Sequence, residues 1–315
     1  MSLATAGVHI GCGVAHVTDL TSTEVEVAGC AACPSRGPFR SDRSAGPGTP
    51  ILCGVTPDNL RAALVPPYAA VDIVSTTAST NADLVVAAGR GAVDRTVLIA
   101  EQQTAGQGRR SRSWASPEGG LYLSILLRPD DVPSERRAWL TMLAGIALVR
   151  TARWAGADAV LKWPNDLLLG PDRGKGAGVL AEATAGGVVL GVGLNVAPLQ
   201  DVPPGAGGLA ATSLADAGAT RLDRADLAIR LLTEVATLDD AWRAAGGDPE
   251  AAGMHSEYVG YCATVGDEVR VELPGRTLTG MATGVGPDGS LLLRTADGAD
   301  HTVSAGDVVH LRAAT

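Results

Sequence analysis

The sequence predicts an α+β protein in which a mixed-sheet domain is followed by a small SH3-like β-barrel. Helical and strand patterns are interleaved up to about residue 260, without the strict strand–helix alternation of a Rossmann fold. From about residue 265, short strands separated by Gly, Pro and Asp-Gly turns run to the C-terminus. We therefore expect a Gly/Pro-rich leader over 1–54, a main domain over 55–262 and the barrel over 263–315.

Apolar periodicity and turn residues locate the elements of the main domain in order. Helices are expected over 58–64, 81–89, 138–154, 223–245 and 249–258, the third capped by Ser134. Strands are expected over 71–74, 97–101, 121–127, 159–162, 167–169, 177–181 and 188–192. The last three strands follow one another around Gly-rich turns, so we expect them to be consecutive in the sheet.

Composition excludes several classes of protein. The chain has 315 residues, of which 46% are hydrophobic and 19% charged, as in a globular protein. No apolar run approaches the roughly 18 residues that cross a bilayer, and the N-terminus lacks the pattern of a secretory signal. The net charge of −9 argues against a broad nucleic-acid surface. Five cysteines, an odd number, suit a reducing compartment, so we expect the cytoplasm.

The leader carries few signals. Its recurring Gly and Pro residues predict poor structure, and no helix-turn-helix pattern is present. A start site placed too far upstream is an open alternative. The spacing of Cys30 and Cys33, with Cys12, His9 and His16 nearby, would allow zinc. Because no second cysteine pair follows, we favour the interpretation without a metal.

Three segments carry residues suited to chemistry on anions. The first, 101–117, is a Gly-containing loop. Its arginines, Arg109, Arg110 and Arg112, could bind carboxylate or phosphate oxygens. A flat ring could stack on its tryptophan, Trp114. On these residues alone, a solvated basic loop beside a core tryptophan is equally favoured.

The second segment, LKWPNDLLL, brings Lys162, Asn165 and Asp166 to the end of a strand, where they could bind phosphates and a hydrated magnesium ion. The alternative is an ordinary Asn-Asp turn. In the third segment, DRGKGAGVLAE, Lys175 lies between two glycines at the start of an apolar strand. An ammonium held there could point into a pocket of low dielectric and bind an anion strongly.

Together these segments resemble biotin protein ligases of the type without an N-terminal DNA-binding domain. The resemblance is carried, in order from about residue 75 to 245, by Ser79-Thr80-Asn81, QQTAGQGRRSRSW, KWPND, KGAGVLAE and GVGLNV. KWPND followed by KGAG is the most specific part. The resemblance implies a catalytic domain similar to class II aminoacyl-tRNA synthetases, which joins biotin to a lysine of a carrier domain with ATP and Mg²⁺ and without a tightly bound metal.

The resemblance also implies roles for individual residues. Lys175 and Arg109 are the expected catalytic residues, next to the biotin carboxylate and the α-phosphate. Biotin is expected to contact Ser79, Thr80, Asn81, Gln103, Gly106, Arg109, Lys175 and Gly178. The nucleotide is expected to contact Arg109, Arg110, Arg112, Trp114, Lys162, Asn165, Asp166 and Asn195, with Asp166 also at the magnesium ion.

The Gly-Arg loop departs from the family pattern at two positions. Gln107 stands where the family has an arginine, which removes one charge-assisted contact to the adenylate. Ser111 stands where the family has a glycine, which restricts the loop if that position needs a positive φ. We therefore expect an active enzyme that retains its acyl-adenylate less tightly.

Three alternative functions agree less well with these residues. A lipoate or octanoate transferase would share the fold but lacks KWPND, and Ser79, Thr80 and Gln103 offer the polar partners that a ureido ring needs. A DNA-binding repressor would need more than the leader, which has three arginines against four acidic residues. An inactive interaction module would not need Arg109 and Lys175. We expect a monomer or weak homodimer whose partners are biotin, ATP and a biotin carboxyl carrier domain, with no specific DNA binding and no membrane.

Overall fold

The computed structural model describes residues 57–199, 202–205, 208–273, 275–304 and 307–310. The leader expected over 1–54, with its Cys30–Cys33 pair, lies outside these ranges. Within them, no helix combines the length and the apolar character needed to cross a membrane.

Seven strands form a mixed sheet, as the sequence predicts. They are β1 (Ala70–Thr77), β2 (Thr96–Gln103), β3 (Leu121–Leu127), β4 (Ala159–Lys162), β5 (Asp166–Leu169), β6 (Gly174–Thr184) and β7 (Gly187–Leu194). Their order is β1-β2-β3-β7-β6-β5-β4, in which β1 and β2 are parallel and the other neighbours antiparallel. The expected succession of three neighbouring strands is confirmed as β5, β6 and β7.

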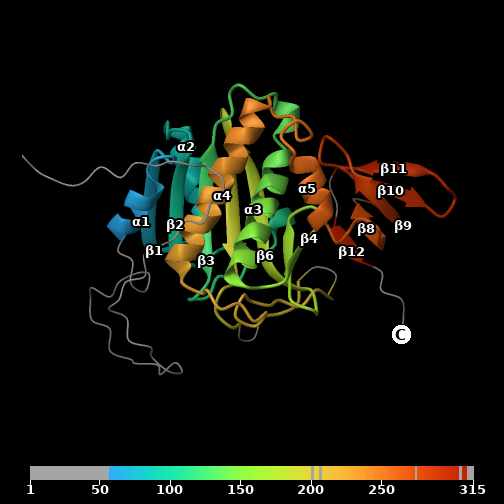
Figure 1. The fold of residues 1–315 in the computed structure, drawn as a ribbon, viewed down its shortest axis with the longest axis horizontal. Helices are drawn as coiled ribbons and strands as arrows, with labels where there is room; N and C mark the ends of the chain where they lie inside the picture. The colour runs from blue at the N-terminus through green and yellow to red at the C-terminus, as the bar shows by residue number, and fades with distance from the viewer. Residues whose placement is uncertain (1–56, 200–201, 206–207, 274, 305–306, 311–315) are drawn as a thin grey trace, which may run out of the picture. The chain divides into compact units, whose positions relative to one another are not determined.

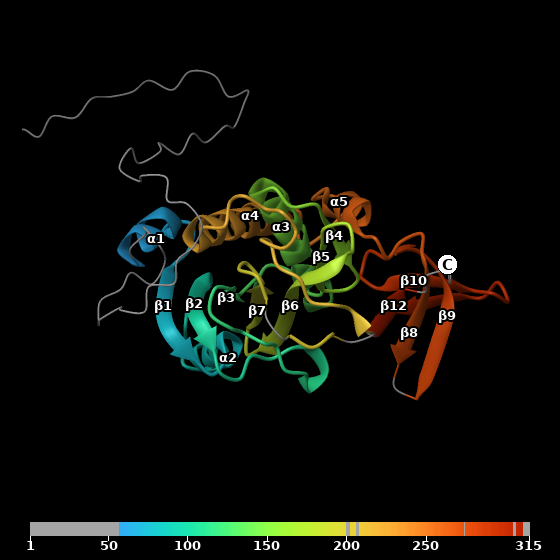
Figure 2. The same ribbon diagram turned by 90° about the horizontal axis from the view of Figure 1, so that it is seen from below.

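Helices cover both faces of this sheet (Figures 1 and 2). They are α1 (Pro57–Leu64), α2 (Thr80–Gly89), α3 (Trp139–Ala155), α4 (Arg224–Ala244) and α5 (Met254–Tyr261). Among the helices of the described ranges, α2 alone lies on one face, where Leu84 and Ala88 pack on Leu98, Leu126 and Val189. The long helices α3 and α4 bury the opposite face in the larger core.

One predicted helix cap and one predicted helix start are wrong. Ser134 does not cap α3: residues Ser134–Arg136 form a separate 3₁₀ turn, and α3 begins at Trp139 without a side-chain cap. The last helix begins at Met254 rather than near residue 249. The Asp248 carboxylate accepts the backbone N–H groups of Glu250 and Ala251, which makes a local turn before the helix.

The C-terminal strands form a second, antiparallel sheet. They are β8 (Glu268–Leu273), β9 (Arg276–Val285), β10 (Leu291–Thr295), β11 (Asp300–Val303) and β12 (Asp307–His310), in the order β11-β10-β9-β8-β12. Alternate residues of these strands, such as Val269 and Val271, are buried, as period-two patterning predicts.

Trp163, the tryptophan of KWPND, joins the two sheets. Its side chain is 2% exposed and its indole Nε1 donates to the Gly289 carbonyl at 2.9 Å, in the turn before β10. Its backbone N–H donates to the Thr264 hydroxyl at 3.0 Å. This residue of the motif therefore has a structural contact with the C-terminal segment.

Replacing Trp163 with phenylalanine is expected to lower the free energy of unfolding by about 1–3 kcal/mol, because the buried Gly289 carbonyl loses its donor. Urea denaturation of the full chain measures this loss. Trp154→Phe is the matched control, since Trp154 is only partly buried against the core. Equal losses for the two variants would contradict the role of the Trp163 hydrogen bond.

Candidate active site

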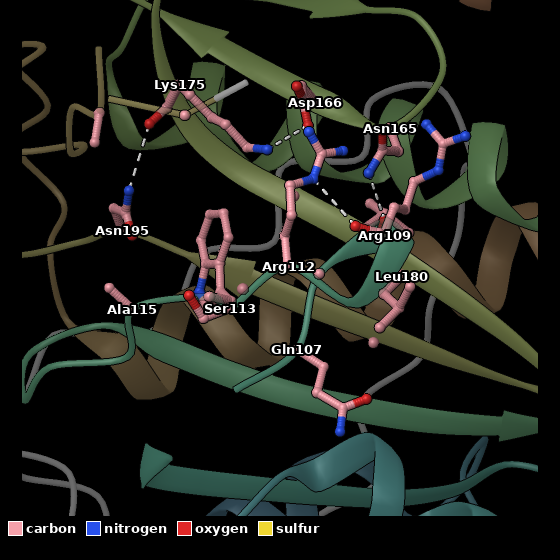
Figure 3. Close-up of a pocket in the computed structure, with 18 of the residues that line it drawn as sticks. Gln107, Arg109, Arg112, Ser113, Ala115, Asn165, Asp166, Lys175, Leu180 and Asn195 are labelled. Atoms are coloured by element: carbon pink, nitrogen blue, oxygen red, sulfur yellow. Dashed lines mark hydrogen bonds and ion pairs between the residues drawn. The ribbon is translucent and has the colours of Figure 1, made fainter. Parts of the chain in front are cut away.

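A cavity of about 480 Å³ lies against β6 and β7 of the main sheet. It is also lined by the start of α2, loop 107–115, the turn 162–166, residues 202–205, 209 and 211 of the loop after β7, and β12. Figure 3 shows several of these side chains pointing toward one another from different strands and loops. The three segments that the sequence singled out thus meet in one place.

Glycines form the floor of the cavity. Gly178 of β6 pairs with Gly193 of β7, and Gly191 is two residues earlier on the same face. A Cβ on Gly193 would overlap the Trp114 indole, and one on Gly191 would overlap the Asn81 carboxamide. Only glycine at these positions lets both side chains lie on the strands. The GVG sequence of β7 therefore places Trp114 and Asn81 directly against the floor of the cavity.

Lys175 projects from β6 into the cavity. Its Nζ lies 2.6 Å from Asp166 Oδ1 and 5.3 Å from the centre of the Trp114 ring. The Lys175 side chain is 24% exposed, so its charge acts in a partly desolvated site. The ammonium is positioned both by a carboxylate and by an aromatic face.

Arg109 reaches the same turn from the Gly-Arg loop. Its Nη1 donates to Asn165 Oδ1 at 3.3 Å, and Asn165 Nδ2 donates to the Val179 carbonyl at 2.8 Å. Because Lys175 contacts Asp166, the two cations bind adjacent residues of one turn (Figure 3). The convergence that the sequence predicts for these side chains is present.

The start of α2 forms a polar end of the cavity. Ser79 is the N-cap, and its Oγ accepts from the Ala82 N–H at 3.4 Å. Gln103 Oε1 accepts from the Thr80 backbone N–H at 2.9 Å, while its Nε2 donates to Ser116 Oγ at 2.9 Å. Ser79, Thr80, Asn81 and Gln103 all line the cavity, as the resemblance implies.

Asn195 also lines the cavity, but its amide nitrogen is engaged with the backbone. Nδ2 donates to the Thr212 carbonyl at 2.9 Å and to the Lys175 carbonyl at 3.4 Å. Thr212 and Lys175 are also joined by a backbone hydrogen bond of 3.0 Å. Asn195 thus ties the loop after β7 to the start of β6, next to the Lys175 side chain (Figure 3).

Two of the expected site residues do not line the cavity. Arg110 instead donates from Nη2 to the Glu272 carbonyl of β8 at 3.2 Å. Gly106 lies behind the lining, where a Cβ would come 2.6 Å from the Trp114 carbonyl oxygen and 2.7 Å from Ser116 Oγ. Arg112, Trp114, Lys162 and Gly178 do line the cavity. Arg110 and Ser111 both have a φ of 57°, in the left-handed region.

Sequence reasoning missed two residues behind the polar end. Ser124 of β3 is fully buried and contacts both Thr80 and Asn81. Glu182, the last residue of the KGAGVLAE segment, accepts from Asn81 Nδ2 at 2.6 Å. A lone serine in the apolar run LYLSILL was the signal for Ser124. No sequence signal pairs Glu182 with Asn81, because they are far apart in the chain.

The charge of the cavity favours anions. Arg109, Arg112, Lys162 and Lys175 line it, against Asp166 as the acidic residue among the described lining residues. No group of three or more potential metal-ligating His, Cys, Asp or Glu side chains occurs in the part of the chain that the structure describes. A single carboxylate suits a magnesium ion that arrives with phosphate ligands rather than a resident metal.

A neutral tyrosine supports the turn that carries Asn165 and Asp166. Burial raises the pKa of the Tyr258 hydroxyl well above its usual range, so the phenol stays protonated. It donates to the Pro164 carbonyl at 3.4 Å. The Tyr258 hydroxyl thus supports the turn as an uncharged donor and adds no negative charge beside the cavity.

Comparison with known proteins identifies this arrangement. Residues 88–197 match the Biotin/lipoate A/B protein ligase family, and residues 264–311 match the biotin protein ligase C-terminal domain. The chain is 44% identical over 251 residues to the biotin--[acetyl-CoA-carboxylase] ligase of Mycobacterium tuberculosis, covering 77% of this chain and 89% of that protein. It is 33% identical over 241 residues to the bifunctional ligase/repressor BirA of Bacillus spizizenii, covering 74% and 71%.

Solved structures agree with the sequence relatives. The biotin protein ligase of Aquifex aeolicus in complex with biotin and ATP superposes with a TM-score of 0.62 at 25% identity, covering 78% of this chain and all of that one. The mixed sheet and the C-terminal antiparallel sheet are thus those of the biotin protein ligase fold. The chain belongs to the biotin protein ligase family.

Proposed function

We propose that this protein activates biotin with ATP to biotinyl-5'-AMP and transfers the biotin to a lysine of a carrier domain of a biotin-dependent carboxylase. The observation that carries the proposal is the approach of Arg109 and Lys175 to the adjacent residues Asn165 and Asp166 in one anion-binding cavity. The names of the Mycobacterium relative and of the Aquifex complex support the same reaction.

We assign the polar end of the cavity to the biotin ring. The Ser79, Thr80 and Gln103 side chains can exchange hydrogen bonds with a ureido group, which has one acceptor oxygen and two N–H donors, whereas the Asn81 amide is engaged with neighbouring protein groups. Trp114, lying over Gly193, offers its ring to the adenine, with Asn195 beside it. We assign the phosphates to the remaining polar side chains of the lining, those of Arg112, Lys162, Asn165 and Asp166. Arg110 contacts β8 instead, so we assign it to holding the loop.

The first step is an in-line displacement at the α-phosphate. A biotin carboxylate oxygen forms a bond to phosphorus while the bond to the β-phosphate oxygen breaks, and pyrophosphate leaves. Both reactants are anionic, so the Lys175 ammonium and the Arg109 guanidinium are needed to reduce their repulsion. The partly desolvated position of Lys175 strengthens this effect.

Magnesium would enter with ATP and be held by Asp166 together with phosphate oxygens. When bound, the ion neutralises charge on the phosphates. Asp166 Oδ1 is paired with Lys175 at 2.6 Å, so the same carboxylate also orients the ammonium beside the phosphate site.

The second step transfers the acyl group. The unprotonated amine of a carrier lysine attacks the acyl carbon of the mixed anhydride, AMP leaves with the bonding electrons, and the new amide nitrogen loses a proton. Water would attack the same carbon. Loop 107–115, which lines the cavity, is placed to shield the intermediate until the carrier arrives.

Mass spectrometry of a carboxylase carrier domain tests the proposal. Incubation with this protein, biotin and Mg-ATP should add one biotin to one lysine. Octanoate or lipoate in place of biotin should give no product. Transfer of octanoate or lipoate, and not biotin, would assign the chain to the transferase branch of the family instead.

The departures in the Gly-Arg loop predict a measurable defect. Introducing Gln107→Arg and Ser111→Gly together should slow release of biotinyl-adenylate by about tenfold, through one added charged contact and relief of the left-handed strain at Ser111. Release of a preformed adenylate, followed after dilution, measures the rate. The single variants separate the charge effect from the backbone effect. An adenylate release rate equal to that of the wild type in both single variants would contradict this explanation.

Other expectations complete the proposal. We propose that the catalytic domain resembles class II synthetases and that the C-terminal sheet is an SH3-like barrel, with a boundary near 262–263. The end of α5 at Tyr261 and the C-terminal family match from residue 264 support that boundary.

We expect a cytoplasmic monomer or weak homodimer. Salt-sensitive binding to an operator-like duplex would contradict our expectation of no specific DNA binding.

A further inference from the structure

A chain of hydrogen bonds runs from Glu182 to the polar end of the cavity. Asn81 Nδ2 donates to Glu182 Oε2 at 2.6 Å and to the Leu180 carbonyl at 3.2 Å. Asn81 Oδ1 lies 2.6 Å from Ser124 Oγ, which also lies 2.7 Å from Thr80 Oγ1. Neither Glu182 nor Ser124 lines the cavity, whereas Asn81 and Thr80 do.

The acceptors on β6 decide which way the Asn81 amide points. A carboxylate and a carbonyl can only accept, so both require the amide nitrogen on their side. Asn81 Oδ1 must then face Ser124. The Glu182 contact is the shorter of the two and is charge-assisted, so it makes the larger contribution to this orientation.

The orientation of Asn81 in turn fixes the Ser124 proton. A hydroxyl has one proton, and Asn81 Oδ1 cannot donate, so Ser124 gives its proton to Asn81. Ser124 then has no proton for Thr80. The Thr80 oxygen keeps its lone pairs for another donor, while its own proton can go to Ser124 Oγ or to Gln103 Oε1, 3.1 Å away.

We propose that Glu182 and Ser124 are positioning residues for biotin, acting through Asn81 to hold Thr80 Oγ1 as an acceptor for a ureido N–H. This inference rests on the proposed function, since it needs the polar end to take the ureido ring. With the Asn81 amide reversed, Ser124 would donate to Thr80 and compete with that N–H. The packing of Asn81 on Gly191, where a Cβ would overlap its oxygen, restricts the amide further.

Equilibrium binding of biotin to the full chain, without ATP, tests this inference. Glu182→Ala should raise the Kd for biotin about tenfold, the loss expected when a charge-assisted hydrogen bond is removed. Glu182→Gln keeps an acceptor oxygen and should restore much of the affinity. Glu268→Ala is the matched control, an exposed glutamate of β8 that is not among the residues lining the cavity, and should leave the Kd unchanged.

Two further readouts separate positioning from a general structural effect. The KM for ATP should stay unchanged in Glu182→Ala. Ser124→Ala in the Glu182→Ala background should cost less than Ser124→Ala alone, because the chain is already broken.

The outcomes are distinct. A Kd for biotin within twofold of wild type in Glu182→Ala, or equal losses of affinity for biotin and for ATP, would overturn the positioning role. Failure of the wild-type protein to bind biotin at all would instead overturn the proposed function.

Discussion

Replacing Lys175 with alanine is expected to lower the rate of biotinyl-adenylate formation about 100- to 1,000-fold, the range for losing one preorganised electrostatic contact at a reacting centre. The ammonium lies in the cavity, 2.6 Å from Asp166 and over the Trp114 ring. Without it, two anionic reactants would meet with less compensating charge. Biotin-dependent release of pyrophosphate in the absence of carrier measures the rate.

Arg173→Ala is the matched control for this prediction. Arg173 lies two residues before Lys175, but its guanidinium pairs with Asp158 at 3.0 Å, and it does not line the cavity. Its removal should leave pyrophosphate release near the wild-type rate. Comparable losses for both variants would mean that overall charge, rather than the placement of Lys175, controls the step.

Replacing Arg109 with alanine is expected to weaken retention of the adenylate and to raise the KM for biotin, each by about 10- to 100-fold, as for the loss of a charge-assisted contact to an anion. Arg109 is held by Asn165, which is itself anchored to the Val179 carbonyl of β6. The guanidinium is therefore in place before substrate binds, so the Arg109 side chain loses little conformational entropy on binding. Adenylate release and steady-state kinetics give the two values.

Arg110→Ala distinguishes the geometry from the family pattern. The Arg110 guanidinium is directed to the Glu272 carbonyl rather than into the cavity, so the expected effect is much smaller than that of Arg109→Ala. An equal effect would show that Arg110 enters the site in the working enzyme, as the resemblance to other ligases implies.

The elements that follow a simple pattern could be predicted from the sequence. β3 and β4 have the predicted bounds, because each is an apolar run ended by polar or turn residues. The capping of α3 could not be predicted, because Ser134 has the chemistry of a cap but forms a 3₁₀ turn instead. Capping depends on the backbone conformation around the residue, which its identity alone does not determine.

The candidate site shows a similar division. Residues that would touch substrate, such as Lys175 and Arg109, have chemistry that stands out in a glycine-rich loop. Residues that hold other residues do not, because Ser124 and Glu182 act through contacts between segments distant in the chain. The left-handed backbone at Ser111 was visible in the sequence only as a departure from a glycine.

The most direct test of the central claim is a single-turnover experiment with the full chain, biotin and Mg-ATP but no carrier. Convergence of Lys175 and Arg109 on one cavity predicts a burst of one pyrophosphate per chain, followed by slower release, and a biotinyl-adenylate that native mass spectrometry detects on the protein directly after the burst. A wild-type protein that binds both substrates yet releases no pyrophosphate until carrier is added would contradict the account.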